Sequence, residues 1–119
     1  MNYSPYKSTV TDITLVNFLN EELKYDLETI PGIGPKAKLI LAEKNIHNSF
    51  QLVAKFMNFK ESEGEDCTEH CTKFFNFLHE AGIKSNRHSI TKCIAEKIAI
   101  AFPHLYTESQ FSEPMESEC

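Results

Sequence analysis

The sequence predicts an all-α protein, a compact bundle of four to five short helices. Leucines and isoleucines recur at helical spacing along 15–23 and again along 90–98, so that each set lies on one face of a helix. Only four glycines and five prolines interrupt the 119 residues, and an apolar fraction of 41% with nine phenylalanines is enough to build a packed core. No segment shows the polar and apolar alternation of a half-buried strand, and we therefore expect no sheet.

Capping residues and helix breakers set the expected limits of each element. Helices are expected at about 12–23, 36–44, 50–59, 66–81 and 87–102, with a single turn at 27–30. Ser49 is expected to cap the third helix, and Ser85 or Asn86 the last one. Asn45 and Gly82 are expected to end the second and fourth helices in a left-handed conformation.

Composition and charge divide the chain into three expected parts. Residues 1–10 are polar and predict a flexible arm, residues 11–106 form the helical domain, and residues 107–119 predict an acidic disordered tail. The net charge is −5, yet residues 61–69 and 108–119 hold nine acids and no base. The rest of the chain beyond residue 28 carries ten bases against three acids. The centre is therefore basic, with an acidic insertion at about 61–71, and the role of the acidic parts stays open between solubility, autoinhibition and partner binding.

Targeting signals are not apparent. The N-terminus lacks a signal-peptide pattern, and no stretch approaches the roughly 20 apolar residues of a membrane span. We expect an intracellular protein without direct membrane insertion. Its four cysteines are expected to be free thiols.

One segment carries a recognisable motif. Residues 30–46 read Ile-Pro-Gly-Ile-Gly-Pro-Lys-Ala-Lys-Leu-Ile-Leu-Ala-Glu-Lys-Asn-Ile and resemble the helix-hairpin-helix family. Gly32 and Gly34 allow tight backbone angles and let a ligand approach without a Cβ in the way. The turn then leads into a helix N-terminus, where free N–H groups and the helix dipole favour an anion.

The side chains around the turn fit the same interpretation. Ile33 is expected to point inward as an anchor, and Ala37 is small enough for close helix packing. Lys36 and Lys38 lie in the first turn of the helix, where bases are unfavourable unless a phosphate neutralises them. Such contacts position a protein on DNA without reading its sequence.

A wider pattern covers about residues 27–102. It consists of the hairpin, an apolar helix ending in Lys55-Phe56-Met57-Asn58-Phe59-Lys60, a helix with Phe74-Phe75-Asn76-Phe77-Leu78, the pair Ala81-Gly82 with a basic turn after it, and a last helix with Cys93. This order resembles the barrier-to-autointegration factor family. The resemblance implies a small helical bundle that binds and compacts double-stranded DNA without sequence preference, bridges it as a homodimer, and docks nuclear-envelope or chromatin proteins without catalysis or cofactors.

The resemblance also implies which residues contact DNA: the hairpin and the turn before the last helix. Carried over to this chain, they are Gly32, Ile33, Gly34, Lys36, Ala37, Lys38, Lys84, Ser85, Asn86, Arg87 and His88. The chain departs from the family in its acidic insertion, its acidic tail, its longer N-terminal extension, and Ile40 where the family commonly has a lysine. Ile40 removes one phosphate contact relative to the family and predicts a lower DNA affinity.

Two other chemistries are weaker interpretations. Cys67, His70 and Cys71 include zinc ligands, but no second pair of ligands follows at regular spacing, and we expect no metal. No cysteine is marked as an activated nucleophile, and the acids cluster in segments expected to be flexible, so we expect no enzyme. The competing interpretation is a protein-interaction module that keeps the hairpin fold and has little or no DNA affinity.

Overall fold

The computed structural model describes residues 2–106 and confirms the all-α prediction. The elements are η1 (Pro5–Lys7), α1 (Asp12–Asn20), η2 (Leu27–Thr29), α2 (Pro35–Glu43), α3 (Ser49–Asn58), α4 (Cys67–Ala81) and α5 (Arg87–Ala101). No strand occurs in this part of the chain. The predicted disordered tail, residues 107–119, lies outside the described residues.

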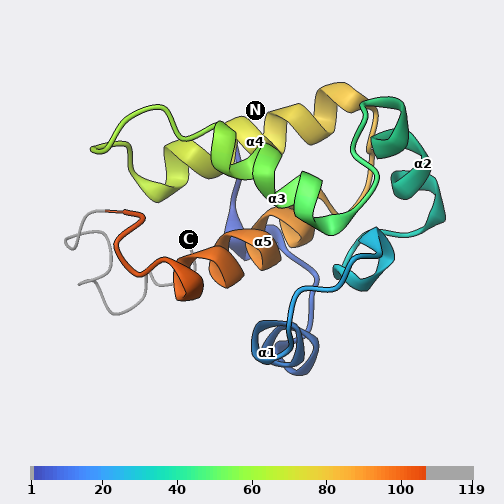
Figure 1. Ribbon diagram of the computed structural model, residues 1–119, viewed down its shortest axis with the longest axis horizontal. Helices are drawn as coiled ribbons and strands as arrows, with labels where there is room; N and C mark the ends of the chain where they lie inside the picture. Colours follow the sequence, from blue (N-terminus) through green and yellow to red (C-terminus); the bar gives the residue numbers. More distant parts are fainter. Residues whose placement is uncertain (1, 107–119) are drawn as a thin grey trace.

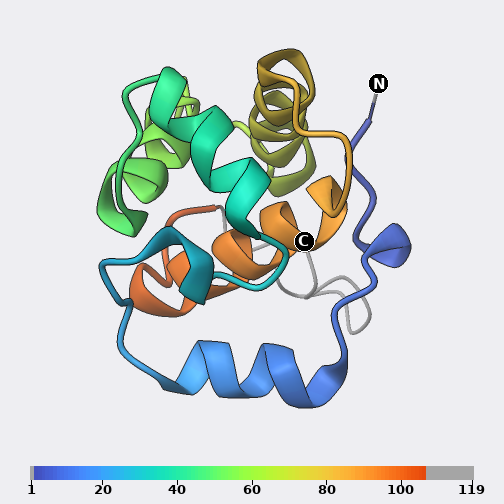
Figure 2. The ribbon, with the colours of Figure 1, turned by 90° about the vertical axis from the view of Figure 1, so that its right-hand side faces the viewer.

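Helix α5 forms the centre of the bundle. Helices α3 and α4 cover one side of it, α1 crosses the opposite side, and α2 lies at one end (Figures 1 and 2). The last helix can hold this position because much of its surface is buried: Ile90, Cys93, Ile94, Ala95 and Ile98 are buried, together with the small polar residues Ser89 and Thr91. Among the helices of residues 2–106, none has the length and apolar character that a membrane crossing requires.

Two helix ends differ from the expectation for identifiable reasons. Helix α1 ends at Asn20, not near Leu23, and Glu21 after it has extended backbone angles. The Lys97 ammonium donates to the carbonyl oxygens of Phe18 and Glu21 at this end and lies over the Phe18 ring. A cation on the last carbonyls of a helix satisfies groups that lack a partner. The same bonds attach α1 to α5.

The cap of α3 also differs. Asn48, not Ser49, accepts the N–H of Gln51 and caps the helix. Ser49 is fully buried instead, and its hydroxyl and N–H donate to the carbonyls of Asp26 and Tyr25. Ser49 therefore fastens the start of α3 to the segment before the hairpin.

Residues 2–10 do not extend from the domain as the expected arm would. Tyr3 is only 4% exposed, and its N–H donates to the Thr72 hydroxyl on α4. The Ser4 N–H donates to His88 Nδ1, and the Thr9 N–H donates to the Ser89 hydroxyl at the start of α5. The amino-acid composition did not predict this packing, because a single buried ring, that of Tyr3, anchors a mostly polar segment.

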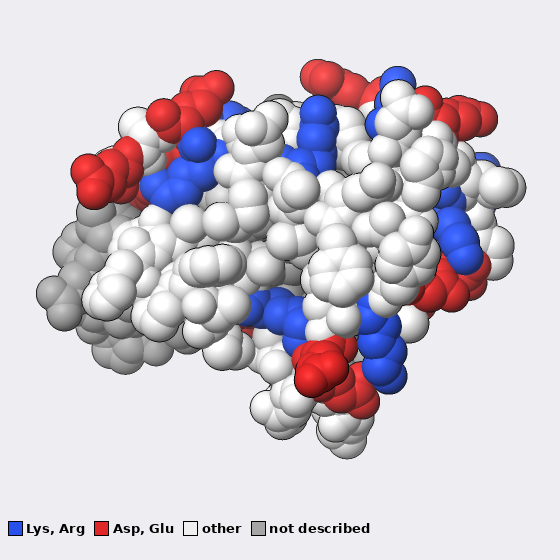
Figure 3. Space-filling model, viewed as in Figure 1, with Lys and Arg blue, Asp and Glu red and all other residues white. Residues whose placement is uncertain are grey.

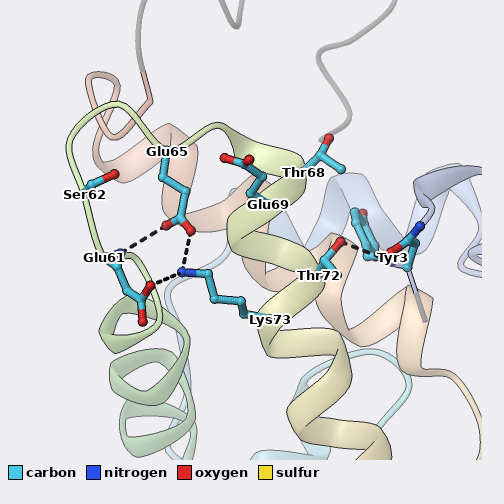
Figure 4. Close-up of a pocket in the computed structure, with 9 residues that line it drawn as sticks. Tyr3, Glu61, Ser62, Glu65, Thr68, Glu69, Thr72 and Lys73 are labelled. Atoms are coloured by element: carbon cyan, nitrogen blue, oxygen red, sulfur yellow. Dashed lines mark hydrogen bonds and ion pairs between the residues drawn. The ribbon is translucent and has the colours of Figure 1, made fainter.

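The acidic insertion is tied down by one lysine. Lys73 on α4 lies 2.9 Å from a Glu61 carboxylate oxygen and 2.5 Å from one of Glu65 (Figure 4). Burial opposes ionisation of Glu65, but the bonds from Lys73 and from the Glu61 N–H prevail and lower its pKa. The insertion is thus part of the packed structure and not a free acidic loop.

His70 forms a buried polar contact in the core. Its Nε2 lies 2.6 Å from the Phe56 carbonyl oxygen, so Nε2 must carry the proton, and Nδ1 accepts from the Tyr106 hydroxyl at 2.7 Å. Burial lowers the pKa of His70. The folded protein therefore holds this imidazole neutral.

This neutral histidine predicts a loss of stability in mild acid. As the pH falls through the unfolded-state pKa of about 6.5, the unfolded chain takes up a proton that folded His70 resists, so unfolding becomes easier. The free energy of unfolding should fall between about pH 7.5 and 5, by up to about 1.4 kcal/mol per pH unit for this group. Urea titrations of wild type and His70→Gln across this range test the expectation, and an equal slope in both proteins would contradict it.

Candidate nucleic-acid interface

The hairpin and the turn before α5, which are 54 residues apart in sequence, meet in the structure. Asn86 occupies the N-cap position of α5 but does not cap it: its φ is 64°, and its side-chain amide donates to the Gly32 carbonyl at 3.4 Å. The backbone of Gly32 has a φ of 98°, which favours glycine. The structure therefore brings together the two regions that the sequence nominated.

Close packing at Gly32 explains why a glycine is needed there. A Cβ on this residue would lie 2.9 Å from Ile90 Cγ1 and 3.2 Å from Asn86 Cβ. Gly34 differs, because a Cβ there would meet no atom within 4 Å and its φ is −104°. Gly32 is thus required by the fold, whereas the open space at Gly34 leaves the backbone accessible.

Several N–H groups around the turn have no hydrogen-bond partner among residues 2–106. They belong to Gly32, Gly34, Lys36 and Ala37, whereas the neighbouring N–H groups of Ile33 and Lys38 donate to the carbonyls of Ile30 and Gly34. Pro35, at the first position of α2, has no N–H to offer. Unpaired N–H groups at a helix start can bind an anion.

A small cleft opens beside the Gly32 backbone. It has a volume of about 310 Å³ and is lined by Thr9, Val10, Thr11, Thr14, Pro31, Gly32, Asn86 and Ser89. Most of its polar side chains are hydroxyls, and none of its residues is charged. Hydroxyl groups and helix starts are both suitable partners for a phosphate oxygen.

The predicted lysines separate into two kinds. Lys36 and Lys84 are exposed and form no ion pair with a described residue. Lys38 instead lies 3.0 Å from Asp26 and 3.7 Å from Glu28, and the pKa of Lys38 is raised while that of Asp26 is lowered. Lys38 therefore already has two carboxylate partners before the hairpin, and its predicted phosphate contact stays a prediction.

Other predicted contact residues face the protein rather than solvent. Ile33 is buried, as expected for the anchor, and Ala37 packs against the core. The Arg87 guanidinium donates to the Ile83 carbonyl at 2.8 Å, within the turn between α4 and α5, and lies over the Phe75 ring. Ser85 is exposed, and no side-chain contact involves it among the described residues.

His88 is occupied by the N-terminal segment. Its ring lies 4.4 Å from that of Phe75, and its Nδ1 accepts the Ser4 N–H at 3.1 Å. Burial lowers the pKa of His88, and the nearby charges of Lys7 and Arg87 add to this effect. As observed, His88 holds the N-terminal segment and does not reach toward a ligand.

The sequence interpretation missed the contribution of residues 2–11 to this surface. Thr9 and Thr11 line the cleft, and Lys7 is an exposed cation close enough to perturb His88. The only sequence signal was the aromatic residue Tyr3 within a polar stretch, which anchors the segment.

The zinc interpretation lacks support from the geometry. Both ring nitrogens of His70 are engaged in the core, and no group of three or more metal-binding side chains is arranged around a common point in residues 2–106. Cys67 is disulfide-bonded, which corrects the expectation of free thiols at that position. Burial raises the pKa of the Cys93 thiol to about 12. Cys119 lies outside the described residues.

The two hairpin glycines should respond differently to alanine. Gly32→Ala should destabilise the fold by about 2–4 kcal/mol, because it combines a left-handed backbone angle with a clash against buried Ile90. Gly34→Ala should change the free energy of unfolding by less than about 1 kcal/mol. Urea titration of both variants tests this contrast, and equal effects would contradict the packing at Gly32.

Comparison with known proteins adds no relative to this description. No protein-family model, curated protein or solved structure matches the chain.

Proposed function

We propose that the chain binds the phosphate backbone of double-stranded DNA, independently of base sequence, through the hairpin at residues 30–46. The observation that carries the proposal is the set of unpaired N–H groups at Gly32, Gly34, Lys36 and Ala37, beside a hydroxyl-lined cleft. A phosphate oxygen in this position would satisfy groups that the fold leaves open. The role is that of a binding protein without catalysis or cofactor.

The positive charge around the hairpin supports a phosphate ligand at this position. Lys7, Lys36 and Lys84 come from three different elements and have no ion-pair partner among residues 2–106. A polyanion would neutralise them, whereas most other bases are already paired or capped within the fold. With these few contacts we expect modest affinity. The proposed role in the nucleus, on chromatin and with nuclear-envelope proteins follows from the family resemblance alone.

Salt dependence and one glycine test the proposal. For two to three phosphate contacts, affinity for a random duplex of about 20 base pairs should fall roughly 10- to 40-fold between about 50 and 200 mM salt. Gly34→Glu should abolish binding, since it places a carboxylate where the phosphate would lie, while Gly34→Ala keeps the same fold without the charge. Fluorescence anisotropy measures the affinities, and circular dichroism checks folding.

The alternative is a protein-interaction module, and one group of side chains favours it. The Tyr25 and Phe50 rings lie 6.5 Å apart and are both more than half exposed, and Leu39 on α2 is also exposed. Apolar side chains in a group of this kind often mark a protein contact. Absence of duplex binding by wild type at low salt would reject the DNA proposal and favour this alternative.

Self-association is a further part of the proposal. Figure 3 shows a broad area without charged side chains in the middle of one face, over α3 and α5, and both helices carry exposed apolar residues, including Phe50 and Ile100. An uncharged patch can pair with its own copy about a two-fold axis.

Sedimentation equilibrium should give about twice the 13.6 kDa chain mass. Ile100→Glu should shift the mass toward one chain, and a wild-type monomer at micromolar concentration would contradict the dimer.

A further inference from the structure

A second cleft lies at the other end of α2 from the hairpin. It has a volume of about 430 Å³, and its walls come from the α2–α3 connection and from α3. The lining residues are Lys44, Asn45, Ile46, Gln51, Ala54, Lys55 and Asn58. We call it the lysine groove. Since α2 has nine residues, the groove and the hairpin are separated by about 13 Å along the helix axis.

The chemistry of the lysine groove is unlike that of the other clefts. Two ammonium groups and three carboxamides line it, and no carboxylate does. By contrast, the cleft beside α4 is lined by Glu61, Glu65 and Glu69, with Lys73 already paired to two of them (Figure 4). Ammonium and carboxamide groups together suit a ligand that offers both negative charge and neutral acceptors, as a nucleic-acid backbone does.

The two lysines are available and partly positioned. Neither Lys44 nor Lys55 forms an ion pair with a residue of the described chain. The Lys55 ammonium lies 5.3 Å from the ring centre of Phe59 and 5.0 Å from that of Phe77, which restrains it without cancelling its charge. Glu43 is the nearest acid in sequence to Lys44, and it does not line the groove.

At the C-terminal end of α2, the carbonyls of Leu41 and Ala42 accept hydrogen bonds from the connection that follows. Asn45 turns the chain with a φ of 65°, and the N–H groups of Lys44 and Ile46 both donate to the Leu41 carbonyl. On α3, the lining side chains follow at spacings of three and four, so they form one stripe of that helix. An extended anion could therefore lie along α3 without meeting a carboxylate among the lining residues.

We propose that the lysine groove is a second binding site for nucleic-acid phosphates. The inference rests on the proposed DNA binding and deepens it, because a chain with two separate phosphate contacts can extend along one duplex or hold a second one. In the second case a single chain could bridge DNA without a dimer.

The test uses Lys44→Gln/Lys55→Gln in the full chain, with Lys24→Gln/Lys92→Gln as a control of equal charge change. Affinity for one random duplex of about 20 base pairs is measured by anisotropy at several salt concentrations. Bridging is measured by energy transfer between two duplexes that carry different dyes. Thermal unfolding establishes that both variants remain folded.

Each outcome has a distinct meaning. If the groove contacts the same duplex, the groove variant should lose about 10-fold or more in affinity and about 2 units of the salt slope relative to the control. If it contacts a second duplex, energy transfer should fall to background while affinity for one duplex stays within about 3-fold of the control. If the groove variant equals the control in both affinity and energy transfer, the proposal for the lysine groove is overturned and the hairpin proposal stands. A wild type that binds no duplex would overturn both.

Discussion

At Gly32 the hairpin backbone approaches the first turn of α5 so closely that no side chain fits between them. This contact fixes the position of the turn through Ile90 and Asn86, which belong to the central helix. The same end of α5 also holds the N-terminal segment, through His88 and Ser89. Three stretches that are distant in sequence thus depend on one helix start. Loss of packing there would disperse the N–H groups, hydroxyls and lysines of the candidate interface together.

The distribution of charge follows from how the fold uses its bases. Lys38 and Lys73 pair with acids, Lys97 donates to carbonyls at the end of α1, and Arg87 donates to a carbonyl in the turn before α5. These interactions stabilise the junctions between elements, so a count of bases in the sequence overstates the positive charge available to a ligand. What is left for a polyanion is a small number of lysines at the two ends of α2. This arrangement favours a weak, salt-sensitive contact over a broad basic face.

The hairpin illustrates what local sequence can establish. Gly-Ile-Gly followed by Pro35 specifies a tight turn and a helix start, since these residue types set backbone angles and remove a donor wherever they occur. The left-handed ends at Asn45 and Gly82, the buried anchor Ile33 and the all-helical class were predictable for the same reason: each depends on propensity and spacing within a few residues. The turn before α5 was predicted as a DNA contact from the family resemblance, not from local propensity or spacing.

The sequence by itself therefore determined the helices, their approximate ends and the geometry of one turn. Only the tertiary structure decided which charges are free, because pairing depends on which elements become neighbours. Lys38 meets Asp26 across the hairpin, and Tyr3 reaches a pocket beside α4, although neither contact has a local signature. Likewise, the Asn86 side chain does not cap α5 as expected but donates to the Gly32 carbonyl, a partner that only folding brings near. Spacing along a chain encodes helices, whereas the neutralisation and placement of side chains are set by contacts between distant segments.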